Sequence, residues 1–522
     1  EALRKLLKGE TLVAPEDAFE VTASVPHGHG RAVLTAMKRL GFENLLASRP
    51  SKERSIIAAL VAYRVLDPQS KLATTRAWHS STLPTELGVA DVDENSVYSA
   101  MDWLVTRQER IEGKLAKRHL SEGSLVLFDL SSTYVEGEQI DLAEFGYNRD
   151  GKRGKKQINW GILTDREGRP VTLSVFPGST GDPSTLLPQV EKLRAQYGLE
   201  SFTLVGDRGM ITGKHIEQFK GQSGIEWITA LKSQSLRKLV EQEVIHPSLF
   251  DQRNLVEVKS DDYPGERLIA CFNPVLARQR EYKRLDLLEA TERDLERVKR
   301  SVEAARLRGR ERIALKVGEK LGRHNMAKHF TITITDTTFT FEVNKENVER
   351  EALMDGIYVI RTSVTEDTMS AEETVRAYKD LAKLERAFRT MKSIDLRARP
   401  IHHRLADRVK AHLFICMLAY YVRWHMERAW AGLTYKDEHK PSGQDADPVL
   451  PARKSDSAGR KASSGKLENG QPANTFKGLL QSLATITRNT CQQPETGITF
   501  HRITSPNTTQ QKALDLLQEI TV

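Results

Sequence analysis

Apolar residues recur along this chain with two different periods, and the change between them falls near residue 124. In residues 1–120 the apolar positions are three or four apart, as in GRAVLTAMKRLGFENLLA (30–47) and RSIIAALVAYRVL (54–66). This spacing places the apolar side chains on one face of an α-helix. We therefore predict that residues 1–120 form a helical N-terminal module.

From residue 124 the pattern is typical of strands. SLVLFDL (124–130) is a short apolar run, and two further strand-like segments, KQINWGILTD and RPVTLSVFP, flank the turn DREGRP. Such runs predict a buried strand followed by a hairpin. A helix at 183–197 capped by Asp182, a strand at FTLVGD, a helix at 213–220 and a strand at EWITAL follow. This order predicts an α/β fold with a mixed sheet in residues 121–247.

Residues 248–345 interrupt the α/β pattern. Their strand-like segments are separated by a stretch, 278–318, in which Arg and Lys alternate with Glu and Asp, which is typical of a solvated helical hairpin. We predict a β-rich insertion with long charged helices here, after which the α/β pattern resumes in residues 346–430. A helix at 370–392 belongs to that last part and begins with a Ser370–Glu373 capping box.

The C-terminal residues contain a weaker pattern. Residues 431–474 are polar and rich in Ser, Gly, Pro and Lys, so they cannot bury much apolar surface, and we predict a disordered linker. Residues 475–522 are expected to form a C-terminal helical tail. The longest apolar run, LFICMLAYYV (413–422), is about half a membrane span, which indicates a buried helix and no membrane partner.

Composition narrows the class of protein only slightly. The chain of 522 residues has a formal net charge of +8, which permits a nucleic-acid partner without requiring one. Its three cysteines are far apart, and no pair has metal-ligand spacing. A sparse, odd set of cysteines argues against a disulfide framework and favours the reducing cytoplasm.

Two apolar strands end in an aspartate in the same way. LVLF leads into Asp129, and LVG leads into Asp207. Strands that are apolar on both faces are usually neighbours in a sheet. We therefore expect the two carboxylates at one edge, where they would repel each other unless a cation lay between them. Oxygen ligands alone suit Mg²⁺ or Mn²⁺. In the alternative interpretation, each carboxylate only accepts backbone N–H groups of the following turn.

The predicted helix at 370–392 supplies a third carboxylate. Its stripe of residues at spacings of three and four should be buried, yet it includes Glu385 and Lys392. We interpret Glu385 as a third metal ligand and Lys392 as a contact to phosphate; the alternative is a surface helix. Three carboxylates can hold two metal ions, which clamp the attacking and leaving oxygens of a phosphodiester. The stripe comprises Tyr378, Leu381, Glu385, Phe388 and Lys392.

A basic loop lies between the first aspartate and the hairpin. The segment GYNRDGKRGKKQINW (146–160) has five Lys or Arg residues within eight positions, interleaved with glycines. A flexible cationic loop beside a metal site could hold a DNA backbone, and a solvated loop is an equal alternative. The five residues are Arg149, Lys152, Arg153, Lys155 and Lys156.

These segments together carry a family resemblance. FDLSSTYVEG, the basic loop continuing into GILTDREGRPV, LVGDRGMI and YKDLAKLERAFRTMK resemble the DDE transposases of bacterial insertion sequences, in the branch with a Tyr-Arg-Glu-Lys signature. Tyr378, Glu385 and Lys392 match the spacing of that signature. Leu381 stands at the arginine position, and Lys383 or Arg389 is a candidate for the missing phosphate contact.

The resemblance implies both a fold and an activity. It implies an RNase H-like catalytic core interrupted by the β-rich insertion, with Asp129, Asp207 and Glu385 as catalytic residues that bind two Mg²⁺ or Mn²⁺ ions. The implied reaction is cut-and-paste DNA cleavage and strand transfer at insertion-sequence ends. The implied partners are double-stranded DNA and a second protomer. The N-terminal module would bind the DNA at the ends of the transposon. A non-catalytic DNA-binding protein derived from a transposase is the competing interpretation, and the presence of all three carboxylates favours the enzyme.

Overall fold

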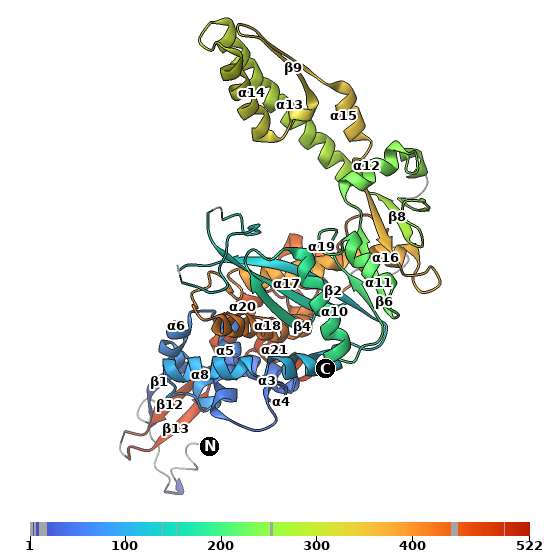
Figure 1. Ribbon diagram of the computed structural model, residues 1–522. Helices are drawn as coiled ribbons and strands as arrows, with labels where there is room; N and C mark the ends of the chain where they lie inside the picture. Colours follow the sequence, from blue (N-terminus) through green and yellow to red (C-terminus); the bar gives the residue numbers. More distant parts are fainter. Residues whose placement is uncertain are drawn as a thin grey trace. The chain divides into compact units, whose positions relative to one another are not determined.

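The chain is divided into two compact units. The computed structural model describes residues 4, 7–9, 18–137, 139–152, 154–250, 254–439, 447–494 and 496–521 (Figure 1). The first unit comprises Glu1–Ile225, Asp380–Pro441 and Arg453–Val522, and the second comprises Glu226–Lys379 and Ser442–Ala452. Asp129, Asp207 and Glu385 therefore all belong to the first unit.

Residues 28–119 of the first unit are helical, as predicted, whereas Glu20–Pro26 form a strand, β1, where the prediction expected helix. Polar side chains accept hydrogen bonds from backbone N–H groups at several helix starts, including Ser51 from Arg54 (3.2 Å) and Asp93 from Ser96 (2.9 Å), which satisfies N–H groups that the helix leaves without a partner. The helices are α3 (Gly28–Arg39), α4 (Phe42–Leu46), α5 (Lys52–Leu66), α6 (Lys71–Arg76), α7 (Leu83–Glu86), α8 (Glu94–Val105) and α9 (Gln108–His119).

The C-terminal segment is not an all-helical tail. It contains α20 (Phe476–Ala484), β12 (Thr487–Gln492), β13 (Thr499–Ile503) and α21 (Thr508–Gln518). Strand β1 (Glu20–Pro26), near the other end of the chain, pairs antiparallel with β12, so the sheet order is β1-β12-β13. Helix α3 packs against both α20 and α21. The N-terminal helices and the C-terminal segment are therefore parts of one module.

Four strands of the first unit lie in the order β4-β3-β2-β5. They are β2 (Ser124–Tyr134), β3 (Gln157–Asp165), β4 (Pro170–Pro177) and β5 (Phe202–Val205). Strands β2, β3 and β4 are antiparallel, whereas β2 and β5 are parallel. This mixed sheet, with α9 and α18 against β4 and α17 against β2, confirms the predicted α/β fold class with a mixed sheet.

The segment predicted as one helix at 183–197 is composite. A 3₁₀ turn (Asp182–Thr185) leads into α10 (Leu186–Glu191), which ends in a π-helical turn (Lys192–Gln196). The carboxylate of Asp182 forms no cap hydrogen bond, because it is paired with the guanidinium of Arg149. The predicted cap is therefore wrong, and the ion pair that replaces it lies close to the candidate site.

Helix α18 (Ala406–Ala429) forms the centre of the first unit's core. It contains the run LFICMLAYYV, which is fully buried as predicted, and it packs against α3, α5, α8 and β4. Among the described residues, no helix combines the length and the apolar character needed to cross a bilayer.

The second unit contains its own four strands in the order β6-β11-β8-β7. Strands β7 and β8 fall in the predicted insertion, yet β8 pairs with β11, so the insertion shares a sheet with the segment expected to resume the core. The bounds are β6 (Ile225–Ala230), β7 (Leu255–Val258), β8 (Arg267–Phe272) and β11 (Ile357–Thr362); helices α11 (Gly213–Lys220), in the first unit, and α12 (Ser233–Glu241) precede and follow β6 along the chain.

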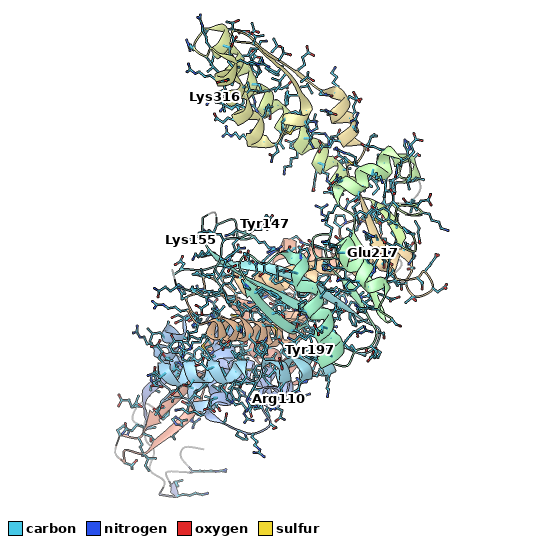
Figure 2. The ribbon with its side chains drawn as sticks, viewed as in Figure 1. Arg110, Tyr147, Lys155, Tyr197, Glu217 and Lys316 are labelled. Atoms are coloured by element: carbon cyan, nitrogen blue, oxygen red, sulfur yellow. The ribbon has the colours of Figure 1, made fainter. Side chains whose placement is uncertain are left out.

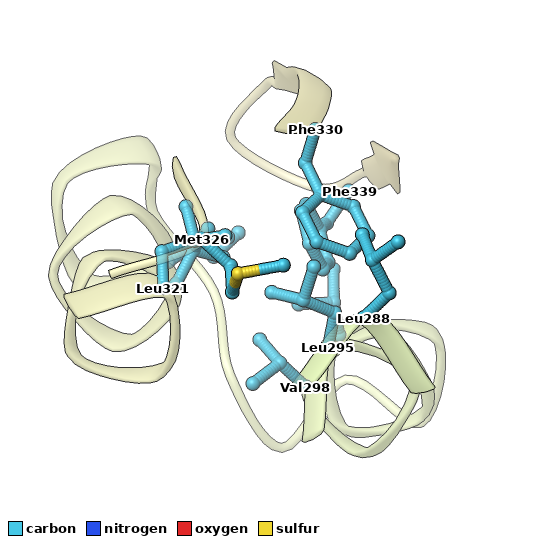
Figure 3. Close-up of a cluster of buried hydrophobic side chains, with 10 residues drawn as sticks. Leu288, Leu295, Val298, Leu321, Met326, Phe330 and Phe339 are labelled. Carbon is cyan, nitrogen blue, oxygen red and sulfur yellow. The ribbon is translucent and has the colours of Figure 1, made fainter. Parts of the chain in front are cut away.

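The charged stretch forms the predicted helical hairpin. Helices α13 (Pro274–Glu303) and α14 (Arg310–His324) pack with strands β9 (Phe330–Ile334) and β10 (Phe339–Val343), and α15 (Lys345–Ala352) follows. A small core of ten buried apolar side chains holds this part together, with Leu295, Met326 and Phe339 among them (Figure 3). None of these ten core residues is charged, so the alternating charges of the stretch lie outside this core.

The predicted linker at 431–474 contains regular structure where it is described. Helix α19 (Asp456–Ser464) begins at Ser455, whose hydroxyl accepts a hydrogen bond from the N–H of Ala458 (3.1 Å). The side chain of Lys461 is 4% exposed and pairs with Glu438. The prediction of disorder is therefore wrong for these residues; positions 440–446 lie outside the described residues.

Candidate active site

The two aspartates follow neighbouring parallel strands at corresponding positions. In the parallel pairing of β2 and β5, Leu127 is opposite Val205. Asp129 follows two positions later within β2, and Asp207 follows two positions after Val205, in the turn just beyond the end of β5. The prediction that these two strands are neighbours is confirmed. The negative charge of Asp207 also raises the pKa of Asp129, which requires the two carboxylates to be close.

The carboxyl group of Asp129 has an unusually high pKa. Burial makes the largest contribution to the raised pKa, the charge of Asp207 raises it further, and the pKa reaches about 7. Two groups oppose this shift: the backbone N–H of Leu130, which donates to Oδ1 of Asp129 at 2.7 Å, and the guanidinium of Arg149. Near neutral pH this site therefore holds a proton that a cation could replace.

Asp207 also shapes its own turn. Its Oδ1 accepts hydrogen bonds from the N–H groups of Gly209 (2.9 Å) and Met210 (2.7 Å). This is the structural role that the alternative interpretation of the sequence assigned to such an aspartate. The side chain of Asp207 is nevertheless exposed, so the turn fixes one oxygen and leaves the carboxylate accessible. The structural role and the ligand role are therefore compatible.

Glu385 lies on α17 (Leu381–Lys392), a helix that covers the same face of the sheet. On β3, Trp160 is opposite Ser131, so its side chain shares a face with Asp129. The buried ring of Trp160 meets Phe388 of α17 edge to face, with centroids 5.1 Å apart. Trp160 is therefore a core residue. Glu385 itself is exposed, and it lies three residues before Phe388, the residue that packs α17 against Trp160.

A family model described as a transposase DDE domain matches residues 121–422, which is more than half of the 522-residue chain. The chain belongs to this family. The matched span contains Asp129, Asp207 and Glu385. No curated protein matches the chain.

Two solved transposase structures are similar to this DDE-family chain at low identity. One is a piggyBac transposase synaptic complex with hairpin DNA, at 9% identity and a TM-score of 0.34, covering 88% of this chain and 76% of that one. The other is a Mos1 transposase paired-end complex with the left transposon end, at 11% identity and a TM-score of 0.15, covering 37% of this chain and 62% of that one.

The donor atoms of this DDE domain fit a divalent cation only in part. The Asp129–Asp207 pair offers the oxygen ligands that Mg²⁺ and Mn²⁺ prefer. A nearby cation would also stabilise the ionised form of Asp129. Among the described residues, however, no three His, Cys, Asp or Glu side chains lie close enough together to hold a metal ion. The structure thus brings the two aspartates together and leaves Glu385 outside their cluster.

The predicted helix at 370–392 consists of two helices. Helix α16 (Ala371–Lys379) starts with the predicted Ser370–Glu373 capping box and ends before Asp380, where the N–H of Lys383 bonds to the carbonyl of Asp380 (2.8 Å). The carboxylate of Asp380 is held by Arg166 (3.2 Å) and by Lys383 (3.0 Å). The predicted stripe is therefore interrupted: Tyr378 belongs to the second unit and Glu385 to the first.

The three cationic side chains of α17 that are candidate DNA contacts, Lys383, Arg389 and Lys392, have different environments. The ammonium of Lys392 bonds to Asp150 at 2.9 Å, and burial lowers its pKa although Asp150 opposes the shift. Arg399 bonds to the same oxygen of Asp150 at 2.6 Å, and Asp150 is only 2% exposed. Lys383 is engaged by Asp380, whereas Arg389 is exposed. Of the two candidates for the missing arginine contact, Arg389 is therefore the more accessible.

The basic loop is anchored at its base and exposed at its tip. Lys152 and Lys155 are exposed and Lys156 is half-buried, while Arg153 lies outside the described residues. Figure 2 labels Lys155 and Tyr147 on this surface of the first unit. Sequence reasoning missed Asp150, which anchors the loop through Lys392 and Arg399. The only signal was its position as the one acidic residue in a basic run.

Proposed function

We propose that this DDE-family protein is an active transposase that cuts double-stranded DNA at the ends of an insertion sequence and joins those ends to a target, by a cut-and-paste route. The observation that supports this most strongly is the placement of Asp129 on β2 and of Asp207 just beyond the end of the adjacent parallel strand β5, with a pKa of about 7 at Asp129. A carboxyl pair of this kind is what a catalytic cation needs.

Asp129, Asp207 and Glu385 would hold two Mg²⁺ or Mn²⁺ ions. When bound, such ions stabilise the charge on the attacking and leaving oxygens. Asp129 must lose its proton for this, so activity should rise with pH around 7. Glu385 lies in the second turn of α17, close to the break at Asp380. In our proposal, binding of DNA and metal moves that turn toward the two aspartates.

The remaining roles concern DNA. Residues 1–120 would bind the element ends, and the loop cations Arg149, Lys152, Arg153, Lys155 and Lys156 would follow the phosphate backbone near the cleaved bond. Arg389, Lys392 and Tyr378 would contact DNA from the signature helices. The working complex would be a homodimer on paired ends, associated with the bacterial nucleoid in the cytoplasm.

A non-catalytic DNA-binding descendant of a transposase is the second candidate. It is favoured by Leu381 at the signature arginine position and by Glu385 lying outside a three-residue cluster in the described chain. Such a protein would bind the same ends and leave them uncut.

A cleavage assay separates the two. The protein is incubated with Mg²⁺ and DNA that carries the sequences flanking its own gene, and cuts are mapped at the element ends. Asp129→Ala, Asp207→Ala and Glu385→Ala should each abolish nicking while retaining end binding in a gel-shift assay. Asp91→Ala, at an exposed turn of the same unit, is the matched control. Binding without any cutting by the wild type supports the second candidate, and nicking that survives one of the three changes excludes that residue.

A further inference from the structure

Two aromatic side chains on the basic loop are presented to solvent. Phe145 is 65% exposed and Tyr147 is 82% exposed, and only Gly146 separates them. Aromatic side chains of this size usually contribute to cores or interfaces, so a pair of exposed rings on one short segment indicates a binding surface.

The backbone that carries these rings is held firmly on both sides. Glu144 and Gln157 exchange two backbone hydrogen bonds, at 3.1 and 2.9 Å. The buried side-chain amide of Gln157 donates to the carbonyls of Tyr147 (2.9 Å) and Gly178 (3.0 Å). A Cβ atom on Gly146 would lie 2.1 Å from the carbonyl oxygen of Gly178, so only glycine fits between the two rings. The exposure of the rings is thus a fixed property of the fold.

One of the two rings has a cation over it, and the segment that follows the rings is basic. The guanidinium carbon of Arg149 lies 5.6 Å from the centre of the Tyr147 ring, and the ammonium of Lys152 lies 5.9 Å from the ring of Tyr134. Residues 145–156 contain five Lys or Arg and one Asp. The backbone N–H of Arg149 donates to Oγ of Ser132 at 2.9 Å, and Ser132 lies on β2 three residues after Asp129, so this segment runs beside the strand that carries Asp129.

We propose that Phe145 and Tyr147 form a stacking platform for unpaired bases of single-stranded DNA beside the carboxylate site. Exposed rings among cations are the combination that binds single strands, because each base offers a flat face to a ring while its phosphate meets a cation. Bases inside a duplex are already stacked on one another, so the platform selects DNA whose strands have separated. The inference rests on the proposed function in one respect only, namely that the separated strands belong to an end of the element.

Binding measurements in EDTA test the platform without any cleavage. A single-stranded oligonucleotide of about a dozen nucleotides carries 2-aminopurine, whose fluorescence is quenched by stacking, and a duplex of the same sequence is measured in parallel. Tyr147→Ala and Phe145→Ala should each weaken single-strand binding by on the order of 5- to 100-fold and relieve the quenching. Duplex affinity should change by less than about twofold in the same variants.

One conservative variant and one control complete the test. Tyr147→Phe retains the ring and should retain affinity. Tyr282→Ala removes an equally exposed tyrosine (69%) from α13 of the second unit and should change nothing. Because both rings are exposed, thermal melting of the variants should match the wild type.

Several outcomes would overturn the platform. These are unchanged single-strand affinity, equal losses for single strand and duplex, or a change in oligomeric state on sedimentation, which would make the rings a contact between two copies of the chain. A protein that never nicks DNA can still pass this test, and one that nicks can still fail it. Failure of the platform and failure of the proposed activity are therefore distinguishable.

Discussion

The raised pKa of Asp129 makes a quantitative prediction about stability. The carboxyl group moves from an ordinary value of 3.8 to about 7 in the folded protein. Well below pH 3.8 the carboxyl group is protonated in both the folded and the unfolded state, so it has no effect on the free energy of unfolding. As pH rises toward 7, the unfolded chain loses its proton first, so the free energy of unfolding should fall. A shift of about three pH units corresponds to a loss of up to ~4 kcal/mol.

Asp129→Asn mimics the protonated carboxyl group and should remove this loss. In EDTA the variant should match the wild type well below pH 3.8 and exceed its free energy of unfolding by up to ~4 kcal/mol above pH 7. Asp207→Asn removes only one of the two causes, so it should recover a smaller part. Urea denaturation followed by tryptophan fluorescence across this pH range measures each difference, with Asp91→Asn as the exposed control.

Mg²⁺ gives the same prediction a second readout. A cation on the ionised pair stabilises the folded state by mass action, so it should raise the urea midpoint of the wild type at pH 8 and raise that of Asp129→Asn less. Parallel pH profiles for the wild type and Asp129→Asn would refute the reasoning, because they would mean that Asp129 is ionised in the folded protein at the same pH as in the unfolded chain.

Three further changes test the supports of the site. Asp150→Ala leaves the buried ammonium of Lys392 without its partner and should cost about 3–5 kcal/mol; urea midpoints and faster tryptic cleavage at Lys152 would reveal it, and unchanged cleavage would mean that the loop is anchored elsewhere. Phe388→Ala removes the ring that packs α17 on the sheet and should cost about 3–5 kcal/mol in the same denaturation assay. Changing Lys152 and Lys155 to Glu should weaken duplex binding and lower the slope of log affinity against log salt by about two; an identical slope would remove the loop from the DNA path.

The sequence predicted the parts of the site that depend on local pattern. An apolar run that ends in Asp predicts a buried strand with a carboxylate at its end, and the parallel pairing of β2 with β5 confirms that the two strands are neighbours. The capping box at Ser370 also depends on nearby residues, and it is confirmed.

The parts that could not be predicted depend on distant partners. Helical periodicity continues through Asp380, and the break there coincides with a contact to Arg166, 214 positions away. Asp182 has the sequence context of a cap, yet Arg149 engages its carboxylate. The polar composition of residues 431–474 predicted disorder because composition does not show that Lys461 is buried against Glu438.

The pairing of β1 with β12 also affects how the protein is made. Val25 and Arg488 are partners in this sheet, so β1 cannot pair until a strand more than 450 positions later has left the ribosome. Helix α3 cannot complete its packing on α20 and α21 until those helices have been synthesised. A prematurely terminated copy would therefore lose its front module as well as its tail, and a truncated product would be poorly suited to compete with the full-length protein for DNA.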